Sequence, residues 1–489
     1  MAKRKRDDAS KEAQKAGVPT KVVKTAAKVE LPPNDGPETT VQIVTGSYER
    51  VLHGFTAAIP SNAKELPSSV QFVDTFLFEA HASAIRCLAV SPLSKTETSE
   101  PQKVILASGG TDERINLYSL SASPVATNDS YPTVPTLAGN KILENPKNRE
   151  LGSLLHHSAN ICALHFPSRS KLLAAAEDNT ISVTKTRDWT VVSTIKAPRP
   201  KVQGRPSGDT APPGGSPAGV NDFAVHPSMK LMLTVGRGEK CMRLWNLVTG
   251  KKAGVLNFSK EILQSVKEGK WSPGEGRKIE WNSEGDEFAV AFEWGAVIFG
   301  TDSIPICRAL PSPRSKIHQI KYVDIGQSTE NKVGFLAVST EDGRVIFYST
   351  KKVQKAADDD ESPIPYAEAV ASLGGKQADL PGRVKDFEIL KLDSPSESNK
   401  DEFVVVTGGS DGTVRLWLLD GAELHDKKAS TKTPQVGKLL NSYETGNRIT
   451  CLKAFVMLAP EDPSALDFSE DELESDEAEE SASEESDDE

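Results

Sequence analysis

Three observations predict that this 489-residue chain is all-β and folds as a seven-bladed β-propeller. A hairpin recurs along the chain in seven copies when the weak ones are included, and six of the seven turns carry an acidic residue. A short strand with apolar residues at its first, fourth and sixth positions precedes most copies. The first copy lacks that strand, whereas an unused one lies after the last copy. A repeated sheet that the two chain ends complete together is typical of a propeller.

The clearest hairpin runs from Phe403 to Trp417, where a β-branched run enters a turn at Asp411-Gly412 and an alternating strand leaves it. Counted from the acid, an aliphatic residue follows at plus three and an aromatic residue at plus six. The turn acids of the copies are Glu49, Asp112, Asp178, Glu239, Asp342 and Asp411, and the strand-closing aromatics are Phe55, Tyr118, Trp245, Tyr348 and Trp417. The weakest copy has Trp294 in place of the acid. We expect the recurring acids to hold the turns of the repeat.

The two ends of the repeat region are expected to pair. No suitable strand precedes the copy at Glu49, but Ile449, Leu452 and Ala454 form an unused apolar strand after the last hairpin. The pattern therefore predicts one propeller over residues 38–458, closed by shared N- and C-terminal strands.

One copy carries a set of polar residues of the kind that staples WD40 repeats. The members of this set are His81, Ser108, Asp112 and Tyr118. The copy with His157 and Asp178 retains part of it. The Trp-Asp dipeptide of such repeats is absent, because neither Trp245 nor Trp417 is followed by an acid.

Composition favours a reduced, intracellular protein without a membrane anchor. No apolar run approaches the roughly 20 residues that a membrane helix needs, and the start of the chain lacks the apolar core of a secretory signal. The cysteines are odd in number and far apart, at positions 87, 162, 241, 307 and 451. We interpret them as reduced core residues and expect neither a metal site nor a cofactor.

Charge is concentrated at the two ends of the chain. The whole chain has a net charge of −11, and residues 461–489 contain sixteen Asp and Glu without Lys or Arg, so the remainder carries +5. Residues 459–489 are predicted to be a disordered acidic tail. One interpretation is a solubilising tail. The alternative is a nucleic-acid mimic that holds basic proteins or shields a basic face until a partner arrives.

The first 37 residues are predicted to be a basic, disordered tail. Lys3, Arg4, Lys5 and Arg6 form a compact cluster that indicates nuclear localisation or nucleic-acid contact. A merely solvated terminus is the alternative. Basic head and acidic tail together favour a nuclear protein.

Long loops are expected at residues 121–150, 196–219 and 351–381. The second of these carries Lys196, Arg199, Lys201 and Arg205 among prolines and glycines, with one acid. A cationic loop on a rigid scaffold suits contact with RNA phosphates or an acidic partner. An insertion without such a role is the rival interpretation.

Several segments resemble one known family. These are Gly46-Ser47-Tyr48-Glu49, the run from Ala174 to Asp178, the run from Thr190 to Ser193 and the run from Val220 to Pro227. They are similar to the maintenance-of-killer (Mak11) and PAK-interacting WD40 proteins. The resemblance implies a nucleolar factor that helps to assemble the large (60S) ribosomal subunit on early pre-60S particles. Its partners would be pre-60S assembly factors, ribosomal proteins and pre-rRNA. The alternative that it implies is an adaptor that binds and inhibits a p21-activated kinase.

An enzyme is the third class considered. Gly408, Ser410 and Gly412 match the spacing of a hydrolase nucleophile elbow, which requires a strand followed by a helix. Here the residues that follow alternate as a strand, and sister copies lack the serine. We therefore predict a non-catalytic scaffold.

Overall fold

The structure is a computed structural model that describes most of the repeat region. It describes residues 38–60, 63, 69–93, 102–125, 133–135, 141–199, 219–269, 272–326, 333–355, 362–378, 380, 382–392, 401–425 and 433–459. Both predicted tails, apart from residue 459, lie outside the described residues. Within the described residues the regular structure is nearly all β-strand, which confirms the predicted all-β class. The exceptions are α1 (Lys260–Ser265), α2 (Ala422–His425) and the 3₁₀ turn Lys376–Ala378.

The first sheet combines the two ends of the described chain. Its strands β1 (Glu38–Ser47), β2 (Val51–Pro60) and β3 (Gln71–Glu79) are antiparallel neighbours. The last strand, β30 (Ile449–Val456), pairs antiparallel with β1, so that Val41 lies opposite Val456. The short strands β7 (Thr133–Pro135) and β8 (Lys141–Leu143) extend the outer edge of β3.

The remaining sheets are antiparallel meanders of four strands that follow one another in chain order. The next three are β4 (Ile85–Val90), β5 (Lys103–Gly110), β6 (Ile115–Ser121) and β9 (Arg149–Leu154); β10 (Ile161–Ser168), β11 (Lys171–Ala176), β12 (Thr180–Lys185) and β13 (Val191–Lys196); and β14 (Val220–Val225), β15 (Leu231–Gly236), β16 (Cys241–Asn246) and β17 (Lys251–Asn257). The last three are β18 (Lys278–Trp281), β19 (Glu287–Ala291), β20 (Ala296–Gly300) and β21 (Pro305–Ala309); β22 (Ile317–Ile325), β23 (Val333–Thr340), β24 (Arg344–Gln354) and β25 (Tyr366–Gly374); and β26 (Val384–Leu392), β27 (Glu402–Gly409), β28 (Thr413–Asp420) and β29 (Lys438–Glu444). A single parallel bridge between Arg308 and Tyr366 joins β21 to β25.

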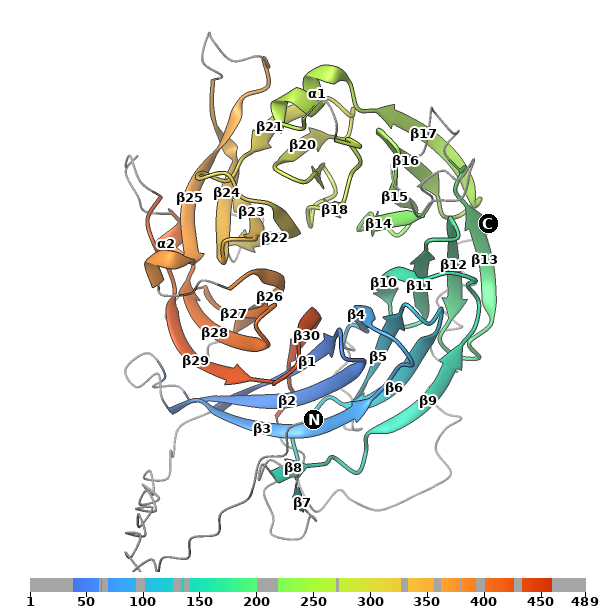
Figure 1. The fold of residues 1–489 in the computed structure, drawn as a ribbon, viewed down its shortest axis with the longest axis vertical. Helices are drawn as coiled ribbons and strands as arrows, with labels where there is room; N and C mark the ends of the chain where they lie inside the picture. Colours follow the sequence, from blue (N-terminus) through green and yellow to red (C-terminus); the bar gives the residue numbers. More distant parts are fainter. Residues whose placement is uncertain are drawn as a thin grey trace, which may run out of the picture. The chain divides into compact units, whose positions relative to one another are not determined.

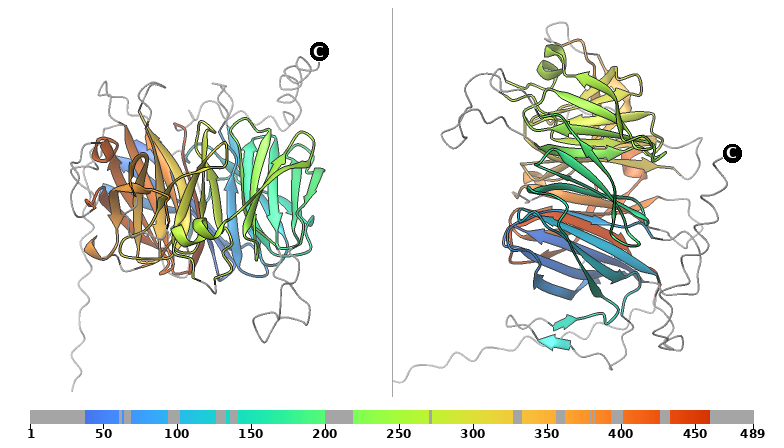
Figure 2. Two further views of the ribbon diagram at one scale, coloured as in Figure 1. Left: turned by 90° about the horizontal axis from the view of Figure 1, so that it is seen from above. Right: turned by 90° about the vertical axis from the view of Figure 1, so that its right-hand side faces the viewer.

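The sheets are arranged radially, and the first strand of each meander faces the centre (Figure 1). Figure 2 shows the same strands edge-on, running between the two faces of the disc. This is the arrangement of a β-propeller.

Two predicted loops contain strands. β7, β8 and the start of β9 lie within residues 121–150, and β25 lies within residues 351–381. The expectation of a loop was wrong at these strands. For β9 the reason is that most of its side chains are exposed, which weakens the apolar alternation that marks a strand. Of the predicted loop 196–219, residues 200–218 lie outside the described residues.

A β-bulge explains why apolar residues recur at the first, fourth and sixth positions of the inner strands. The register shifts just after Ile85 in β4, Ile161 in β10, Val220 in β14, Ile317 in β22 and Val384 in β26. A bulge inserts one residue, so a spacing of three places two side chains on the same face of the strand. The third and fifth positions then point to the opposite side, toward the centre.

Apolar cores lie between neighbouring sheets. Val41 and Phe55 of the first sheet pack in one cluster with Val404 and Leu416 of the last. Close packing requires small residues before the turns. A Cβ on Gly46 would lie 2.7 Å from Cys451 Sγ and 2.7 Å from Ile85 Cγ2, so only glycine fits there.

Candidate functional site

The predicted staple around His81 is formed. His81 Nδ1 lies 3.0 Å from Asp112 Oδ1, and His81 Nε2 lies 2.8 Å from Ser108 Oγ. The backbone N–H of Ala82 also donates to Asp112. Burial alone would raise the pKa of Asp112, but the hydrogen bonds from Ala82 and His81 outweigh it and lower that pKa. Tyr118 interacts with Ser108 through its hydroxyl, and burial raises the pKa of Tyr118 to about 12.

A second staple holds the next sheet. His157 Nδ1 lies 3.3 Å from Asp178 Oδ2, and His157 Nε2 lies 2.8 Å from Ser182 Oγ. The backbone N–H of Ser158 donates to the same carboxylate. Sequence reasoning found His157 and Asp178 but missed Ser182, whose only signal is its position four residues after the acid.

Three turn acids pair with arginine instead of histidine. Within their own hairpins, Arg243 donates to Glu239, Arg344 to Asp342 and Arg415 to Asp411. In two of these sheets the strand-closing tryptophan also donates across the hairpin, from Trp245 Nε1 to Thr234 and from Trp417 Nε1 to Thr407. In these three hairpins the turn acid therefore has an arginine partner from its own hairpin.

In the first and the weakest copies the turn acid contacts residues outside its own hairpin. Glu49 accepts a hydrogen bond from the backbone N–H of Arg448, just before β30. In the weakest copy Glu293, one residue before Trp294, supplies the acid and pairs with Arg277 and Lys316. Arg314 stacks over the Trp294 ring at 4.1 Å. The shift by one residue hid Glu293 from a search at fixed spacing. Phe55 and Tyr348, the remaining strand-closing aromatics, are buried.

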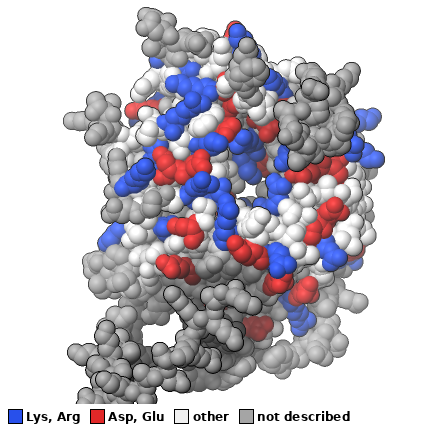
Figure 3. All heavy atoms as spheres, in the orientation of Figure 1, with Lys and Arg blue, Asp and Glu red and all other residues white. Residues whose placement is uncertain are grey.

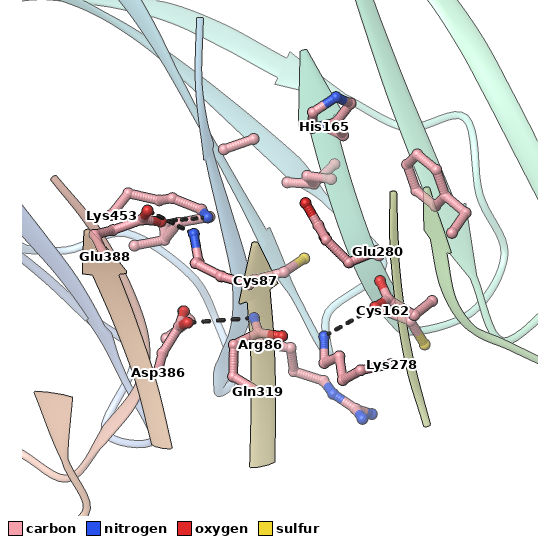
Figure 4. Close-up of a pocket in the computed structure, with 18 of the residues that line it drawn as sticks. Arg86, Cys87, Cys162, His165, Lys278, Glu280, Gln319, Asp386, Glu388 and Lys453 are labelled. Atoms are coloured by element: carbon pink, nitrogen blue, oxygen red, sulfur yellow. Dashed lines mark hydrogen bonds and ion pairs between the residues drawn. The ribbon is translucent and has the colours of Figure 1, made fainter. Parts of the chain in front are cut away.

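The inner strands enclose a cavity of about 870 Å³ at the centre of the propeller (Figure 4). Its lining is charged. Glu388 of β26 lies between two lysines, 2.5 Å from Lys321 Nζ and 2.6 Å from Lys453 Nζ. Beside it, Asp386 accepts hydrogen bonds from Gln319 and from the backbone N–H of Leu452. These contacts tie β22, β26 and β30 together.

The cavity is the central channel of the propeller, and four of its ionisable side chains stand at the same position of their inner strands. Counted from the first apolar residue of the strand, the fifth residue is His165, Lys321, Glu388 or Lys453 in β10, β22, β26 and β30. Glu280 of β18 also faces the channel (Figure 4). Sequence reasoning missed this set, although the alternation of the inner strands contains the signal.

Glu280 and His165 are among the channel groups whose pKa values are shifted. The surrounding protein raises the pKa of Glu280 to about 7, although Lys321 opposes the shift. Burial, together with Lys453 and Lys321, lowers the pKa of His165 to about 4. At neutral pH His165 is therefore uncharged, and Glu280 is partly protonated.

The predicted contact residues are only partly described. Lys196 ends β13, opposite Thr180 at the start of β12, and Arg199 follows it; both side chains are exposed. They lie at the end of the propeller where the turn acids lie. Lys201, Arg205 and the cluster Lys3, Arg4, Lys5 and Arg6 lie outside the described residues.

Neither a hydrolase site nor a metal site stands out among the described residues. Ser410 precedes strand β28, so the helix that a nucleophile elbow requires does not follow it. No group of three His, Cys, Asp or Glu within the described ranges is close enough to hold a metal ion. The cysteines are free thiols, two of them buried. No helix in the described parts is long and apolar enough to cross a membrane.

Radial four-stranded sheets with His–Asp staples define a WD40-type β-propeller. Residues 71–119, 148–184 and 385–417 match the family described as WD domain, G-beta repeat. Protein MAK11 of Saccharomyces cerevisiae is 26% identical over 442 residues, which cover 85% of this chain and 83% of that protein. The p21-activated protein kinase-interacting protein 1-like of Xenopus laevis is 23% identical over 88% of this chain and 85% of its own length. Shk1 kinase-binding protein 15 of Schizosaccharomyces pombe is 28% identical over 45% of this chain and 47% of its own length. These matches make the chain a WD40-repeat protein that is similar to MAK11 and to the p21-activated kinase-interacting proteins over most of its length.

Proposed function

We propose that this chain is a scaffold protein in ribosome biogenesis that assembles the large subunit on early pre-60S particles in the nucleolus. The observation that carries the proposal is the similarity to MAK11 across 85% of the chain. WD40 propellers act as platforms for other proteins, and relatives are named for the proteins that they bind. In this role the chain binds assembly factors and ribosomal proteins, and touches pre-rRNA through phosphate contacts.

The platform is a closed ring of seven blades in this proposal. Pairing of β30 with β1 supports closure, because it joins residues at opposite ends of the repeat region. The hydrogen bond from the backbone N–H of Arg448 to Glu49 supports closure from the turn side of the same sheet.

Deletion of residues 445–458 tests the closure. It should abolish cooperative unfolding of the remaining chain, whereas an unchanged melting temperature would contradict a closed ring.

Charge on the surface suits contact with both proteins and RNA. Figure 3 shows Lys and Arg interspersed with Asp and Glu around the central opening. Mixed charges steer partners and set their orientation. The exposed Lys196 and Arg199, at the entrance to the predicted cationic loop, add positive charge at the turn end. The basic cluster Lys3–Arg6 supplies nuclear targeting.

A kinase adaptor is the second candidate function. It is supported by the relatives from Xenopus laevis and Schizosaccharomyces pombe, whose names state that they interact with a p21-activated kinase or bind a kinase. In this role the propeller binds the kinase and restrains it.

Sedimentation of cell extract that contains the tagged full chain separates the two functions. The scaffold function predicts comigration with large pre-ribosomal particles, and loss of that comigration at high salt or after RNase treatment. A small soluble complex with a kinase, unaffected by RNase, would contradict it and support the adaptor.

Alanine at Lys3, Arg4, Lys5 and Arg6 should also reduce nuclear accumulation of a fluorescent fusion, with the unmodified chain as control.

A further inference from the structure

Five cations gather where four neighbouring inner strands begin. Arg277, Lys316, Arg383, Lys385 and Arg448 stand at the starts of β18, β22, β26 and β30. We call this group the cationic arc. Consecutive strands in this series contact each other. Backbone hydrogen bonds connect the arc to the turns, from Glu341 N to Lys316 O at 2.9 Å and from Ser410 N to Arg383 O at 2.9 Å. The arc therefore borders the end of the channel where the turn acids lie.

The positive charge of the arc is only partly neutralised. Arg277 and Lys316 share one carboxylate, Glu293, at 3.2 Å and 2.7 Å. Arg383 pairs with Glu341 at 3.1 Å. No carboxylate among the described residues forms an ion pair with Lys385 or Arg448. Glu49 also accepts a hydrogen bond from the backbone N–H of Arg448, so the five cations face three carboxylates, and the described part of the arc has an excess of two positive charges.

Burial and the excess of positive charge together lower the pKa values of His318 and Lys385. His318, between Lys316 and Lys385 along the arc, has no hydrogen-bond partner for its Nε2 atom. Burial and four surrounding cations lower the pKa of His318 to about 4, so it stays neutral. Burial and the neighbouring Arg383 and Arg448 also lower the pKa of Lys385. An anion at this place would relieve both effects.

We propose that the cationic arc is the docking surface for the acidic segment 461–489 of this chain. The segment lies outside the described residues, and its sixteen Asp and Glu without Lys or Arg match the arc in sign. This assignment goes beyond the scaffold function and does not depend on it.

The length and origin of the segment allow the contact. β30 begins next to Arg448 and ends at Val456, so the segment starts five residues after a strand that is itself part of the arc. A strand of eight residues spans only about 26 Å, whereas 29 residues reach up to about 95 Å when extended. Tethering also gives the segment an effective concentration in the millimolar range, which favours it over free anions of the same chemistry. A partner of higher charge density would have to displace it.

Zero-length crosslinking of carboxylates to amines in the full chain, followed by peptide mass spectrometry, tests the proposal. Lys316 and Lys385 should crosslink to residues 461–489, and high salt should suppress these products. The variant R383E/R448E keeps both lysines as reporters and should lower the yield about fivefold. The matched control R169E/K230E reverses two exposed cations in the turns at the opposite ends of β10 and β14 and should leave the yield unchanged.

Further control experiments identify what binds the cationic arc. A mixture of isotope-labelled and unlabelled chains separates crosslinks within one chain from those between two copies. Crosslinks mostly between copies would overturn the assignment to the chain's own segment. Absence of segment crosslinks at Lys316 and Lys385, or yields that R383E/R448E does not change, would overturn the docking surface itself. Circular dichroism checks that R383E/R448E folds, and R383Q/R448Q replaces it if it does not. Added single-stranded RNA that left the products unchanged at saturating concentration would exclude RNA as a competitor and support the segment as the preferred occupant.

Discussion

The sheets that begin at β4 and β26 carry the same acid at the same turn, but its partner differs. Asp112 bonds to His81, which comes from the loop before the inner strand and also reaches Ser108 on the second strand. Asp411 pairs with Arg415 inside its own hairpin. The Asp112 side chain is 9% exposed and that of Asp411 is 36% exposed. The acid thus occupies the turn in both sheets. In the β4 sheet, His81 also links it to the second strand, so the loop before the inner strand, the turn and the second strand are held together.

The difference has an energetic consequence. A hydrogen bond to a buried carboxylate cannot be replaced by water when its partner is removed, so the loss is large. An exposed ion pair is screened and is replaced by water at little cost. Loss of the His81 side chain should therefore lower the free energy of unfolding substantially, whereas loss of the Arg415 side chain should change it little.

The largest effect is expected from His81→Ala. The substitution leaves Ser108 Oγ and the Asp112 carboxylate without a histidine partner and should lower the free energy of unfolding by about 3 kcal/mol. Urea denaturation of the full chain measures it. The matched variant Arg415→Ala should cost about 0.5 kcal/mol or less. Equal losses in the two variants would show that the staple has no special role.

Glu388→Gln tests whether loss of a carboxylate in the channel also lowers the free energy of unfolding. The amide has no charge to balance Lys321 and Lys453, so the two ammonium groups repel each other without compensation. We expect a loss of about 2 kcal/mol, less than for a fully dry ion pair because water enters the channel. Urea denaturation at low and high salt measures it, and the loss should shrink as salt screens the lysines. A loss that salt does not change would contradict this explanation.

Trp417→Phe sharpens the comparison within the β26 sheet. Phenylalanine keeps a smaller aromatic ring in the core, but the hydrogen bond from Trp417 Nε1 to Thr407 Oγ1 at 3.2 Å is lost with the indole N–H. Stability should fall by about 1 kcal/mol, the usual value of one buried neutral hydrogen bond. Thermal unfolding followed by circular dichroism measures the change. The double variant with Thr407→Val should cost little more than Trp417→Phe, because both remove the same bond.

Glu280→Gln contrasts the hydrogen-bonded Asp112 with an acid that forms no ion pair with any residue that the structure describes. The folded-state pKa of Glu280 is raised to about 7, so the unfolded chain releases this proton at lower pH than the folded chain. The group therefore costs stability increasingly as pH rises from about 4.5 to 7. Glutamine should remove this cost, with a gain below about 1 kcal/mol at pH 8 because channel water screens the group. Melting temperatures at pH 5 and pH 8 measure it. A gain that is equal at both pH values would contradict the raised pKa.

The pH dependence of Asp112 has the opposite sign. Its folded-state pKa is lowered, so its contribution is present above the unfolded value near pH 4 and disappears as pH falls through the folded value. The carboxyl group with hydrogen-bond partners, Asp112, thus stabilises the fold more as pH rises, whereas Glu280 stabilises it less.

The local pattern of each repeat could be predicted from the sequence. The acid of a turn, the alternating strand after it and the aromatic that closes it lie within a few residues, so their contacts depend on local geometry. His81 with Asp112 and His157 with Asp178 could be paired because similar residues recurred at similar spacing. Strand β9 was missed because a solvated outer strand carries little apolar alternation.

The sequence by itself determined the repeats, their strands and the turns that join them. Tertiary structure alone decided which charges meet: Glu388 between Lys321 and Lys453, Glu293 in place of Trp294, and the excess of cations near Arg448. The contacts of Glu388 join residues 67 and 65 positions apart in different sheets. They depend on a bulge that turns alternate side chains of the inner strands toward the channel. Ion pairs require atoms to come within about 4 Å, and only the packing of one sheet against the next sets such distances.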